Sequence, residues 1–402
     1  MPERESPQVE RDRRTIVVAA SLLCLALPSV VLLVFDLYAE PDVRRVPLYW
    51  LFGSVAVGVG LAFRLVSPYR GLGLVPLAAT FWLGVTVYGL YTGHWPGGAN
   101  GLPLGLIAGA LARGLRGQGS VEENYGLMTA VLVGAGLAWA GVVRERPFTL
   151  AAYTVLGTAS ALVVWSWTRL LRPTIELALE PVFAVMYRIR GTGPGLANFP
   201  RTGPCLVIAN HACWGDPFFL AKYIPRPITP LMTARFFRPG IVGWLTRLFG
   251  IIRVPEGTYK KDAPEIREAI AALDRGECVV IFPEGYLRRT EDRPLRRFGQ
   301  GVWQILKARS QTPVIACWIE GGWGSFTSYQ NGPPTKNKRP DFRRPICVSV
   351  SEPVAVSDRV LADQLRTRLH LMDLVSAART HAGLEPLPKF ELPADPDEDP
   401  PP

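Results

Sequence analysis

Long uncharged apolar stretches fill the first part of the chain, and shorter apolar runs fill the second. The long stretches are Thr15–Phe35, Val46–Phe63, Leu72–Thr92, Gly126–Val143 and Phe148–Thr168. Because a helix needs about 20 apolar residues to cross the hydrocarbon core of a bilayer, each stretch predicts a transmembrane helix. The shorter Leu102–Leu111 spans only if the arginines that follow it reach the interface. We therefore expect about six helices over residues 15–170.

Basic residues near the ends of these stretches predict their orientation. Arg11, Arg13 and Arg14 precede the first stretch, which is too long for the apolar region of a secretory signal peptide. With six spans, the excess of arginine falls on the side that holds the tail, residues 1–14, and everything after residue 170. Because basic loops face the cytoplasm, this predicts an integral protein of the cytoplasmic (inner) membrane with its second half in the cytoplasm.

After residue 172 the pattern changes to short runs rich in Val and Ile that alternate with helical stretches. The runs that read as buried strands are Cys205–Ala209, Gly250–Val254, Cys278–Phe282, Pro313–Ile319 and Ile346–Val350. Alternating strands and helices favour an α/β domain, over residues 173–380, with helices on both faces of a central sheet.

Helix signals and the end of the chain complete this outline. Asp262 as cap, Pro264 in the first turn and Gly276 as stop predict one helix. Ser357 is expected to cap a last helix whose apolar positions run to Val375. Residues 384–402 hold seven prolines and an acidic run, and we expect a disordered tail there.

Charge and cysteine content narrow the class of protein. The 402 residues carry a formal net charge of +10 and a mean hydropathy of +0.16. The basic residues track the membrane-facing segments, which favours an anionic bilayer over nucleic acid as the partner. None of the six cysteines forms a CxxC pair, and no Cys/His set has zinc-like spacing. We expect reduced thiols in a cytosolic domain, without a disulfide framework.

One polar constellation follows the strand Cys205–Ala209 directly. It reads Asn-His-Ala-Cys-Trp-Gly-Asp and places His211 and Asp216 at the carboxyl end of that strand. Ligands bind at this end of the strands in open α/β sheets. An imidazole there can take a proton from a hydroxyl near neutral pH, and a carboxylate can hold its other nitrogen. The alternative is a structural histidine beside a helix-capping aspartate.

A second constellation follows the strand Cys278–Phe282. The sequence continues Phe-Pro-Glu-Gly-Tyr-Leu-Arg-Arg over residues 282–289. Glu284 could accept hydrogen bonds from the hydroxyls of an acceptor molecule, and Arg288 or Arg289 could bind a phosphate in bidentate fashion. The alternative is a surface turn with solvated charges.

The two motifs together resemble the glycerol-3-phosphate/lysophosphatidic acid acyltransferase superfamily. An HxxxxD motif, followed about seventy residues later by FPEG, carries the resemblance, which covers about residues 173–355. The segment Ile319–Ser328 further resembles the acyltransferase part of proteins that fuse a lysophospholipid carrier to a 2-acylglycerophosphoethanolamine acyltransferase. The resemblance implies an acyltransferase domain on the membrane surface, with acyl-CoA or acyl-carrier-protein as donor and without a metal or bound cofactor.

The same resemblance assigns residues to roles. It makes His211 the base and Asp216 its partner, and it puts Glu284 and Gly285 at the acceptor site. Phe282 and Pro283 shape the turn and, with Pro313, which begins the family's fourth block, are expected on the acyl-donor side. The family's second block departs from its usual spacing here, so that Arg253 stands three residues early. Either Arg253 does not bind the acceptor phosphate, or Arg288 or a nearby lysine substitutes for it.

The resulting hypothesis is direct acyl transfer to a lysophospholipid hydroxyl in phospholipid biosynthesis or remodelling. A covalent route through Cys213 is one alternative. A lysolipid carrier or flippase with a binding-only soluble domain, and a thioesterase that uses the same base on water, are the others. The sequence contains no Gly-x-Ser-x-Gly nucleophile elbow.

Basic and large apolar residues also alternate in two short segments, Arg235–Arg238 and Trp244–Phe249. Such a mixture is typical of a surface that lies in the membrane interface. Ordinary helix packing within the domain would produce the same pattern.

Overall fold

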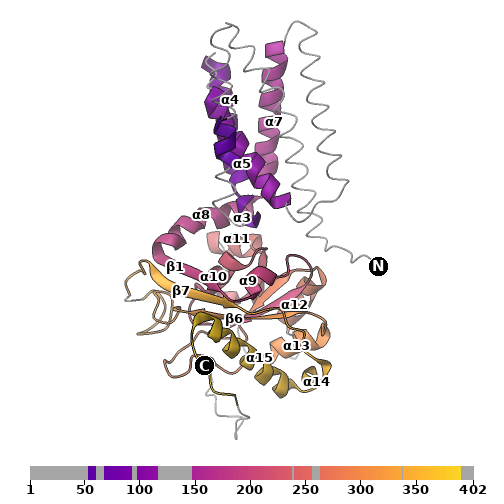
Figure 1. Cartoon of the computed structure of the whole chain (residues 1–402), viewed down its shortest axis with the longest axis vertical. Helices are drawn as coiled ribbons and strands as arrows, with labels where there is room; N and C mark the ends of the chain where they lie inside the picture. Colours follow the sequence, from indigo (N-terminus) through magenta and orange to yellow (C-terminus); the bar gives the residue numbers. More distant parts are fainter. Residues whose placement is uncertain are drawn as a thin grey trace. The chain divides into compact units, whose positions relative to one another are not determined.

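The computed structural model describes residues 53–59, 68–92, 97–115, 147–237, 240–255, 263–336 and 338–390. The chain forms two compact units that meet between Pro181 and Val182, inside helix α8 (Leu171–Met186). The expected boundary near residue 172 therefore lies about ten residues too early, because the helix continues past it. Each unit is described by itself (Figure 1).

The first unit is helical. Its described elements are residues 53–59, α3 (Pro68–Gly71), α4 (Leu74–Thr92), α5 (Gly97–Leu115), α7 (Pro147–Arg169) and the first part of α8. Trp82 of α4, Ile107 of α5 and Val155 of α7 are buried together in one apolar cluster. Small residues allow close approach: a Cβ at Gly58 would lie 2.5 Å from the carbonyl oxygen of Leu102. Glycine at such a contact is typical of closely packed apolar helices.

Three of the expected membrane spans coincide with helices of this unit. Helices α4, α5 and α7 cover the stretches that begin at Leu72, Leu102 and Phe148. Thr15–Phe35 and Gly126–Val143 lie outside the described residues. Within the described residues, only Leu74–Thr92 is both long and apolar enough to cross a membrane by length and composition, and Gly101–Leu111 is a shorter apolar helix. The six-span membrane region and its orientation stay predictions.

The second unit is built on a mixed sheet. Its strands are β1 (Tyr187–Thr192), β2 (Cys205–Ala209), β3 (Ile228–Thr233), β4 (Ile252–Val254), β5 (Cys278–Ile281), β6 (Val314–Glu320) and β7 (Arg344–Val350). They lie in the order β1-β7-β6-β2-β5-β3-β4. All neighbouring pairs are parallel except β6 and β7. The predicted α/β fold with a central mixed sheet is confirmed.

The strand order explains which helices cover which face. The chain steps in one direction across the sheet through α10 (Asp216–Tyr223) and α11 (Ile241–Leu248). It returns through α12 (Pro264–Asp274) and α13 (Gly301–Ala308). Because crossovers between parallel strands are right-handed, a reversal of direction moves the helices to the other face. In Figure 1, α10 and α11 accordingly lie on one side of the sheet, and α13, α14 (Asp358–Leu361) and α15 (Gln364–Ala378) lie on the other.

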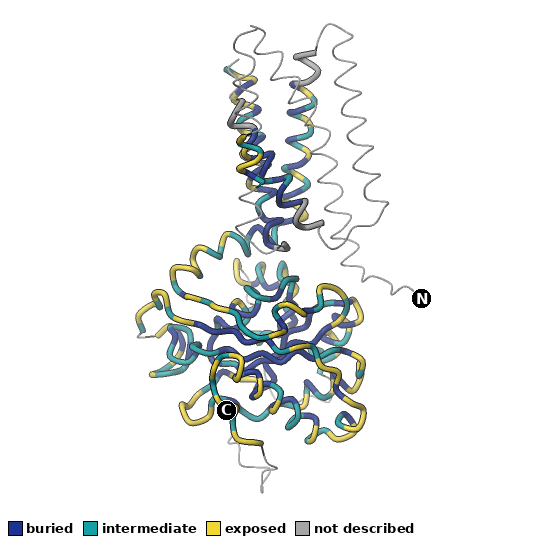
Figure 2. The backbone as a smooth tube through the Cα atoms, in the orientation of Figure 1, coloured by how far each residue is buried: buried dark blue, intermediate teal, exposed yellow. Residues whose placement is uncertain are grey.

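Each face of the sheet has its own apolar core, and the strands between them are the most buried part of the unit (Figure 2). Leu206 and Ile208 of β2 pack with α12, α13 and α15, whereas Val207 packs with Phe219 and Leu220 of α10. This alternation follows from the two-residue repeat of a strand. Because β2 is buried on both faces, it reads as an uninterrupted apolar run.

The predicted strands match β2, β4, β5, β6 and β7 to within two residues at each end. Strands β1 and β3 were not predicted. β1 is an edge strand that alternates polar with apolar residues, and β3 contains Pro230, a residue that usually argues against a strand within a sheet.

The helix predictions have mixed outcomes. Helix α12 begins with Pro264 in its first turn and ends before Gly276, as expected, and Asp262 lies outside the described residues. The prediction of a single last helix after Ser357 is wrong, because the structure has two separate helices there, α14 and α15. The side chain of Asp363 caps the second of them by accepting a hydrogen bond from the Arg366 N–H at 2.6 Å.

The expected tail is partly ordered. Leu384, Leu387 and Phe390 pack against the core that contains α15. The Leu387 N–H also donates to the Ser376 hydroxyl at 2.6 Å. The segment 384–390 therefore belongs to the folded unit, and residues 391–402 lie outside the described part of the chain.

The double burial of β2 makes a testable prediction about stability. Leu206 is fully buried, so Leu206→Ala should lower the free energy of unfolding by about 2–5 kcal/mol through lost transfer energy and the cavity left behind. Phe342→Ala is the control, because that side chain is 76% exposed. Denaturant unfolding in detergent measures both. Equal effects of the two substitutions would contradict the packing described here.

Candidate active site

The side chain of Asn210 holds the carboxyl end of β2 against the neighbouring strand β6. This side chain is buried and bonds both main-chain groups of Ile319 on β6: its Oδ1 accepts from the N–H at 2.7 Å, and its Nδ2 donates to the carbonyl oxygen at 2.9 Å. The side-chain amide thus continues the hydrogen bonding between β2 and β6 beyond the end of β2. It provides partners for the N–H and carbonyl oxygen of Ile319, which would otherwise be buried without hydrogen bonds. His211, the next residue, is thereby held at the carboxyl edge of the sheet.

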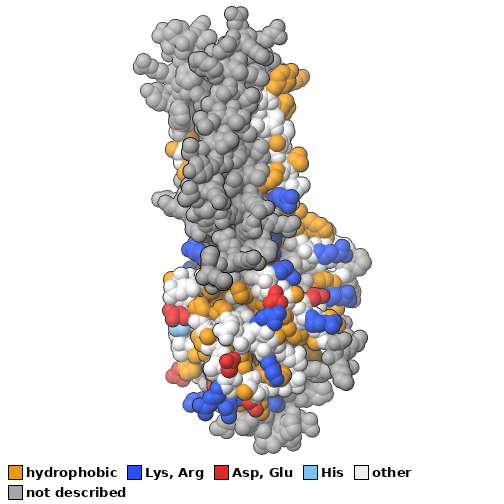
Figure 3. All heavy atoms as spheres, turned by 90° about the vertical axis from the view of Figure 1, so that its right-hand side faces the viewer, with side chains coloured by type: hydrophobic (Ala, Val, Ile, Leu, Met, Phe, Trp, Pro, Cys, Tyr) orange, Lys and Arg blue, Asp and Glu red, His pale blue; other side chains and the backbone are white. Residues whose placement is uncertain are grey.

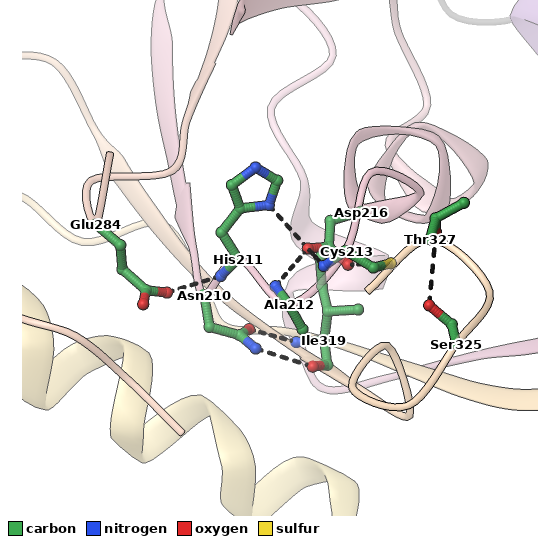
Figure 4. A network of polar contacts seen from close by, with 9 residues as sticks. All are labelled: Asn210, His211, Ala212, Cys213, Asp216, Glu284, Ile319, Ser325 and Thr327. Carbon is green, nitrogen blue, oxygen red and sulfur yellow. Dashed lines mark hydrogen bonds and ion pairs between the residues drawn. The ribbon is translucent and has the colours of Figure 1, made fainter. Parts of the chain in front are cut away.

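The side chain of Asp216 accepts hydrogen bonds from the main chain of the turn between β2 and α10 (Figure 4). It is 0% exposed and begins α10. Its Oδ2 accepts from the N–H of Ala212 at 2.6 Å and from the N–H of Cys213 at 2.9 Å, and it lies 2.9 Å from Nδ1 of His211. Main-chain donors therefore hold this side chain in place at the first turn of α10. The two residues of the HxxxxD motif are therefore in direct contact, as predicted.

The orientation of the His211 ring leaves one nitrogen for chemistry. Nδ1 faces the Asp216 carboxylate, and one face of the ring stacks on Phe282, with centroids 4.1 Å apart and planes 19° apart. The side chain is 20% exposed, so the Nε2 edge is accessible. A carboxylate that accepts from Nδ1 selects the tautomer in which Nε2 is the free base. This arrangement can remove a proton from a bound hydroxyl.

Glu284 holds the main chain of His211 rather than its ring. One carboxylate oxygen accepts from the His211 N–H at 2.7 Å, and the other accepts from the Arg296 N–H at 2.9 Å. The N–H of Arg288 donates to the His211 carbonyl oxygen at 2.8 Å. In Figure 4 the carboxylate approaches the main chain of His211, while the imidazole extends away toward Asp216. The FPEG segment thus clamps both main-chain groups of His211.

Burial sets the charge state of Glu284. Its side chain is removed from solvent, which raises the pKa of the carboxyl to about 8, and the main-chain donors of Arg296 and His211 oppose that rise. The carboxyl is therefore largely neutral at pH 7. A neutral carboxyl still accepts the two main-chain hydrogen bonds that position His211.

Glycine allows the turn that contains Glu284. Gly285 has a φ of +73°, a conformation that other residues rarely adopt, and its N–H donates to the Phe282 carbonyl oxygen at 3.0 Å. The Gly299 N–H donates to the Pro283 carbonyl oxygen at 2.7 Å. Phe282 and Pro283 therefore shape the turn, as predicted, and Phe282 also supports the His211 ring.

The segment between β6 and β7 supports the other side of the motif. The Trp214 N–H donates to the Thr327 carbonyl oxygen at 3.2 Å, and Cys213 pairs with Ser328 in an antiparallel bridge. A Cβ at Gly322 would lie 3.1 Å from Oδ1 of Asp216, so only glycine fits there without displacing a neighbour. Sequence reasoning singled out this segment for its family resemblance but did not assign it a role. Neither Asn210 nor Gly322 was predicted as a site residue.

The surroundings of Cys213 do not suit a nucleophile. Its sulfur is buried and lies 3.2 Å from Oδ1 of Asp216. Burial, and then the Asp216 charge, raise the pKa of this thiol well above its usual value. Because the thiolate is the nucleophilic form, these surroundings disfavour a covalent route through Cys213.

Two arginines after the FPEG turn stack on aromatic rings. The Arg288 guanidinium lies 4.6 Å from the Trp323 ring centroid, and its Nε donates to the Thr290 carbonyl oxygen at 2.8 Å. The Arg289 guanidinium lies 3.5 Å from the Tyr329 ring centroid. Stacking orients each guanidinium. The Arg288 Nη2 also donates to the Glu291 carbonyl oxygen, so two main-chain oxygens occupy one edge of this guanidinium and its remaining N–H groups are the ones left for a phosphate. The FPEG loop and the β6–β7 segment therefore form one cationic, aromatic border beside the motif.

The structure does not bring two predicted site residues to His211. Arg253 is exposed on the edge strand β4, three strands from β2, or about 14 Å at the usual strand spacing. Pro313 precedes β6 and accepts from the Leu206 N–H at 3.0 Å, near the opposite end of β2. Ile319 is the β6 residue beside the motif, about 20 Å further along the strand.

Metal ligation has no support in the part of the chain that the structure describes. Among those residues, no group of three or more His, Cys, Asp or Glu side chains is placed to hold a metal ion. The polar groups of the site bind one another or the main chain instead.

Comparisons with known proteins match this region. The model of the acyltransferase family matches residues 192–320, which include both motifs. An uncharacterised protein of Mycobacterium tuberculosis is 31% identical over 139 residues, which cover 32% of this chain and 36% of the relative. A 1-acyl-sn-glycerol-3-phosphate acyltransferase alpha of Mus musculus is 26% identical over 133 residues, 32% of this chain and 45% of the relative. The chain thus spans less than half the length of these relatives.

One solved structure also aligns with this chain. The 1-acyl-sn-glycerophosphate acyltransferase PlsC of Thermotoga maritima aligns over 64% of this chain and 92% of its own, with a TM-score of 0.40 and 17% identity.

The family match over residues 192–320 and the contacts between the two motifs inside it lead to one conclusion: this part of the chain is an acyltransferase-family domain, similar to that of 1-acyl-sn-glycerol-3-phosphate acyltransferases.

Proposed function

We propose that this protein is a membrane-bound O-acyltransferase that moves a fatty acyl group from a thioester to the hydroxyl of a lysophospholipid. The observation that carries the proposal is the contact of 2.9 Å between His211 Nδ1 and the buried Asp216 carboxylate, within a domain that matches the acyltransferase family. The donor is acyl-CoA or acyl-carrier-protein, and the acceptor is similar to 1-acylglycerol-3-phosphate. The helical first unit anchors the domain at the cytoplasmic side of the membrane.

The chemistry follows from the free Nε2 of His211. This nitrogen takes the proton of the acceptor hydroxyl as its oxygen attacks the thioester carbonyl carbon. The tetrahedral intermediate then collapses, the C–S bond breaks, and the imidazolium returns the proton to the leaving thiolate. Asp216 stabilises the imidazolium between these two steps, because its negative charge is fully buried and lies directly beside Nδ1.

The arginines beside the motif favour an anionic acceptor. Arg288 and Arg289 are oriented by Trp323 and Tyr329 and lie on the loop whose main chain contacts His211. A phosphate bound by their guanidinium edges would sit next to the base. In this proposal Arg288 replaces Arg253, which lies on the edge strand β4.

Glu284 acts in this proposal as a positioning residue. Its two carboxyl oxygens are occupied by main-chain donors of His211 and Arg296. An acceptor hydroxyl would have to share those oxygens, so the first role of Glu284 is to fix the main chain that carries the base.

Loss of the base gives the most direct test of this proposal. His211→Ala should lower kcat by about 10²–10⁴-fold, the usual worth of a general base. Radiolabelled acyl transfer to lysophosphatidate by purified protein measures it, with His381→Ala as the control because that residue is exposed outside the site. Near-normal transfer by His211→Ala would rule out the mechanism. Lysolipid movement across vesicles without transfer by the unaltered protein would favour a carrier.

Asp216→Asn tests the partner of the base separately. The amide would present N–H groups to the main-chain donors of Ala212 and Cys213, or to His211 Nδ1, so the tautomer and the turn would both be disturbed. We expect kcat to fall about 10²-fold or more, with a smaller change in KM for the acceptor. Asp373→Asn, an exposed substitution on α15, should leave kcat unchanged. A change confined to KM would contradict the assigned role.

Glu284 makes a prediction about stability and pH. The folded pKa of about 8 exceeds the unfolded value of about 4.3, so the folded state keeps a proton that the unfolded chain releases above pH 4.3. The free energy of unfolding should therefore fall as the pH rises from about 4.3 to 8. Glu284→Gln removes this titration, so the difference between the unaltered protein and the variant should decline over that range.

Urea unfolding at pH 5, 6.5 and 8 in one detergent measures this difference, with the exposed Glu268→Gln of α12 as the matched control. A difference that stays constant, or that grows in favour of the unaltered protein at pH 8, would show that Glu284 is ionised in the folded state.

A further inference from the structure

Helix α11 exposes its large apolar side chains and buries small or polar ones, the reverse of what a surface helix of a water-soluble domain usually does. Ile241, Val242 and Trp244 are 77%, 55% and 47% exposed, whereas Gly243 and Thr246 are buried. An amphipathic surface helix usually buries its large apolar side chains and exposes its polar ones. The Thr246 hydroxyl donates to the Gly243 carbonyl oxygen at 2.9 Å, so the inward face needs no polar partner elsewhere.

The exposed apolar side chains of α11 form a continuous strip. At 3.6 residues per turn, Trp244, Ile241, Leu245 and Val242 follow one another around the outward side of the helix. Single exposed apolar residues are normal on a protein surface, but a strip of this kind marks an interaction surface. The strip is therefore built to contact an apolar partner.

The strip continues on the neighbouring elements of the same face of the sheet. Phe236, which precedes α11, makes an edge contact with Trp214 of the HxxxxD turn, with ring centroids 5.6 Å apart. Phe218 of α10 is 45% exposed, and α10 and α11 lie on the same side of the sheet (Figure 1). Exposed apolar residues of α10 and α11 thus lie on the same side of the sheet, and Phe236 links the segment before α11 to the turn that carries His211.

The charge of the segment that contains α11 indicates which kind of partner the apolar strip contacts. Residues 217–255 contain no Asp or Glu, and their charged residues are Lys222, Arg226, Arg235, Arg238, Arg247 and Arg253. By contrast, the face of the α/β unit in Figure 3 carries Lys and Arg side chains together with Asp and Glu. Two copies of this segment, whose charged residues are all cationic, would repel each other, whereas a leaflet of anionic lipids attracts it.

We propose that α11 is an interfacial helix that lies in the plane of an anionic leaflet, with Ile241, Val242 and Trp244 among the acyl chains and Arg247 at the head groups. Burial of such a strip together with basic residues is the way that monotopic helices bind bilayers. The α/β unit then contacts the membrane by its own surface, on the side of the sheet that carries α10. A lysolipid in that leaflet would reach His211 without leaving the interface.

Site-specific fluorescence in the full chain tests this surface. Trp244→Cys carries an NBD label, and Cys24→Ser removes the cysteine outside the described residues. The described cysteines at positions 205, 213, 278, 317 and 347 are buried and should not react. The protein is placed in nanodiscs of phosphatidylcholine with phosphatidylglycerol. We expect blue-shifted NBD emission and strong quenching by spin-labelled lipids.

Matched labels make the result specific. Ala271→Cys lies exposed on α12, which packs on the other face of the sheet, and its label should stay water-like. Ile241→Cys gives a second position on α11 in case Trp244→Cys does not fold. Arg247→Glu should reduce quenching at position 244 more in discs with phosphatidylglycerol than in discs of phosphatidylcholine alone.

Water-like emission at positions 241 and 244, equal to that at position 271, would overturn the proposal. A blue shift that appears without lipid quenching and grows with protein concentration would assign the strip to a second copy of the chain instead. The label needs no acyl donor or acceptor. It therefore reports on the surface even if the protein transfers no acyl group, and acyl transfer can stand even if the surface fails.

Discussion

Three donors converge on one oxygen of Asp216 in a place that water does not reach. A buried carboxylate without partners would be strongly destabilising, so the turn from Ala212 to Asp216 has to fold around it. The third donor is Nδ1 of His211. The same electrostatic requirement that shapes the turn therefore also fixes the tautomer and direction of the imidazole. One carboxylate thus both stabilises the turn and orients the base.

The rest of the α/β unit keeps that turn in place. Asn210 ties its start to β6, Glu284 and Arg288 clamp the main chain of His211, and Gly322 lets the β6–β7 segment approach Asp216 closely. All of these contacts meet at the carboxyl edge of the sheet, because parallel strands bring their ends together there. The site is thus built on strand ends and on the turns between them rather than on mobile loops.

Much of this could be predicted from the sequence, because the signals are local. Strands buried on both faces, such as β2, give uninterrupted runs of Val and Ile, and the HxxxxD spacing leads directly to the contact between His211 and Asp216. The edge strand β1 and the proline-containing β3 lack that signal, since they depend on neighbours distant in the sequence.

The role of Glu284 shows where sequence reasoning ended. A carboxylate after a strand suggests a ligand for substrate, but the two oxygens face main-chain N–H groups from segments far apart in the chain. Such partners are set by tertiary packing and leave no pattern in the residues nearby. For α11 the sequence left two interpretations open, an interfacial surface and ordinary helix packing, and the exposure of Ile241, Val242 and Trp244 favours the first.

The central claim is that His211 activates a lysophospholipid hydroxyl against an acyl thioester. Mass spectrometry of the products, after purified protein is incubated with isotopically labelled acyl-CoA or acyl-carrier-protein and a panel of lysophospholipids, tests it most directly. The account predicts a diacyl phospholipid that carries the labelled acyl chain, formed together with free thiol. Labelled free fatty acid without any acylated lipid would contradict it.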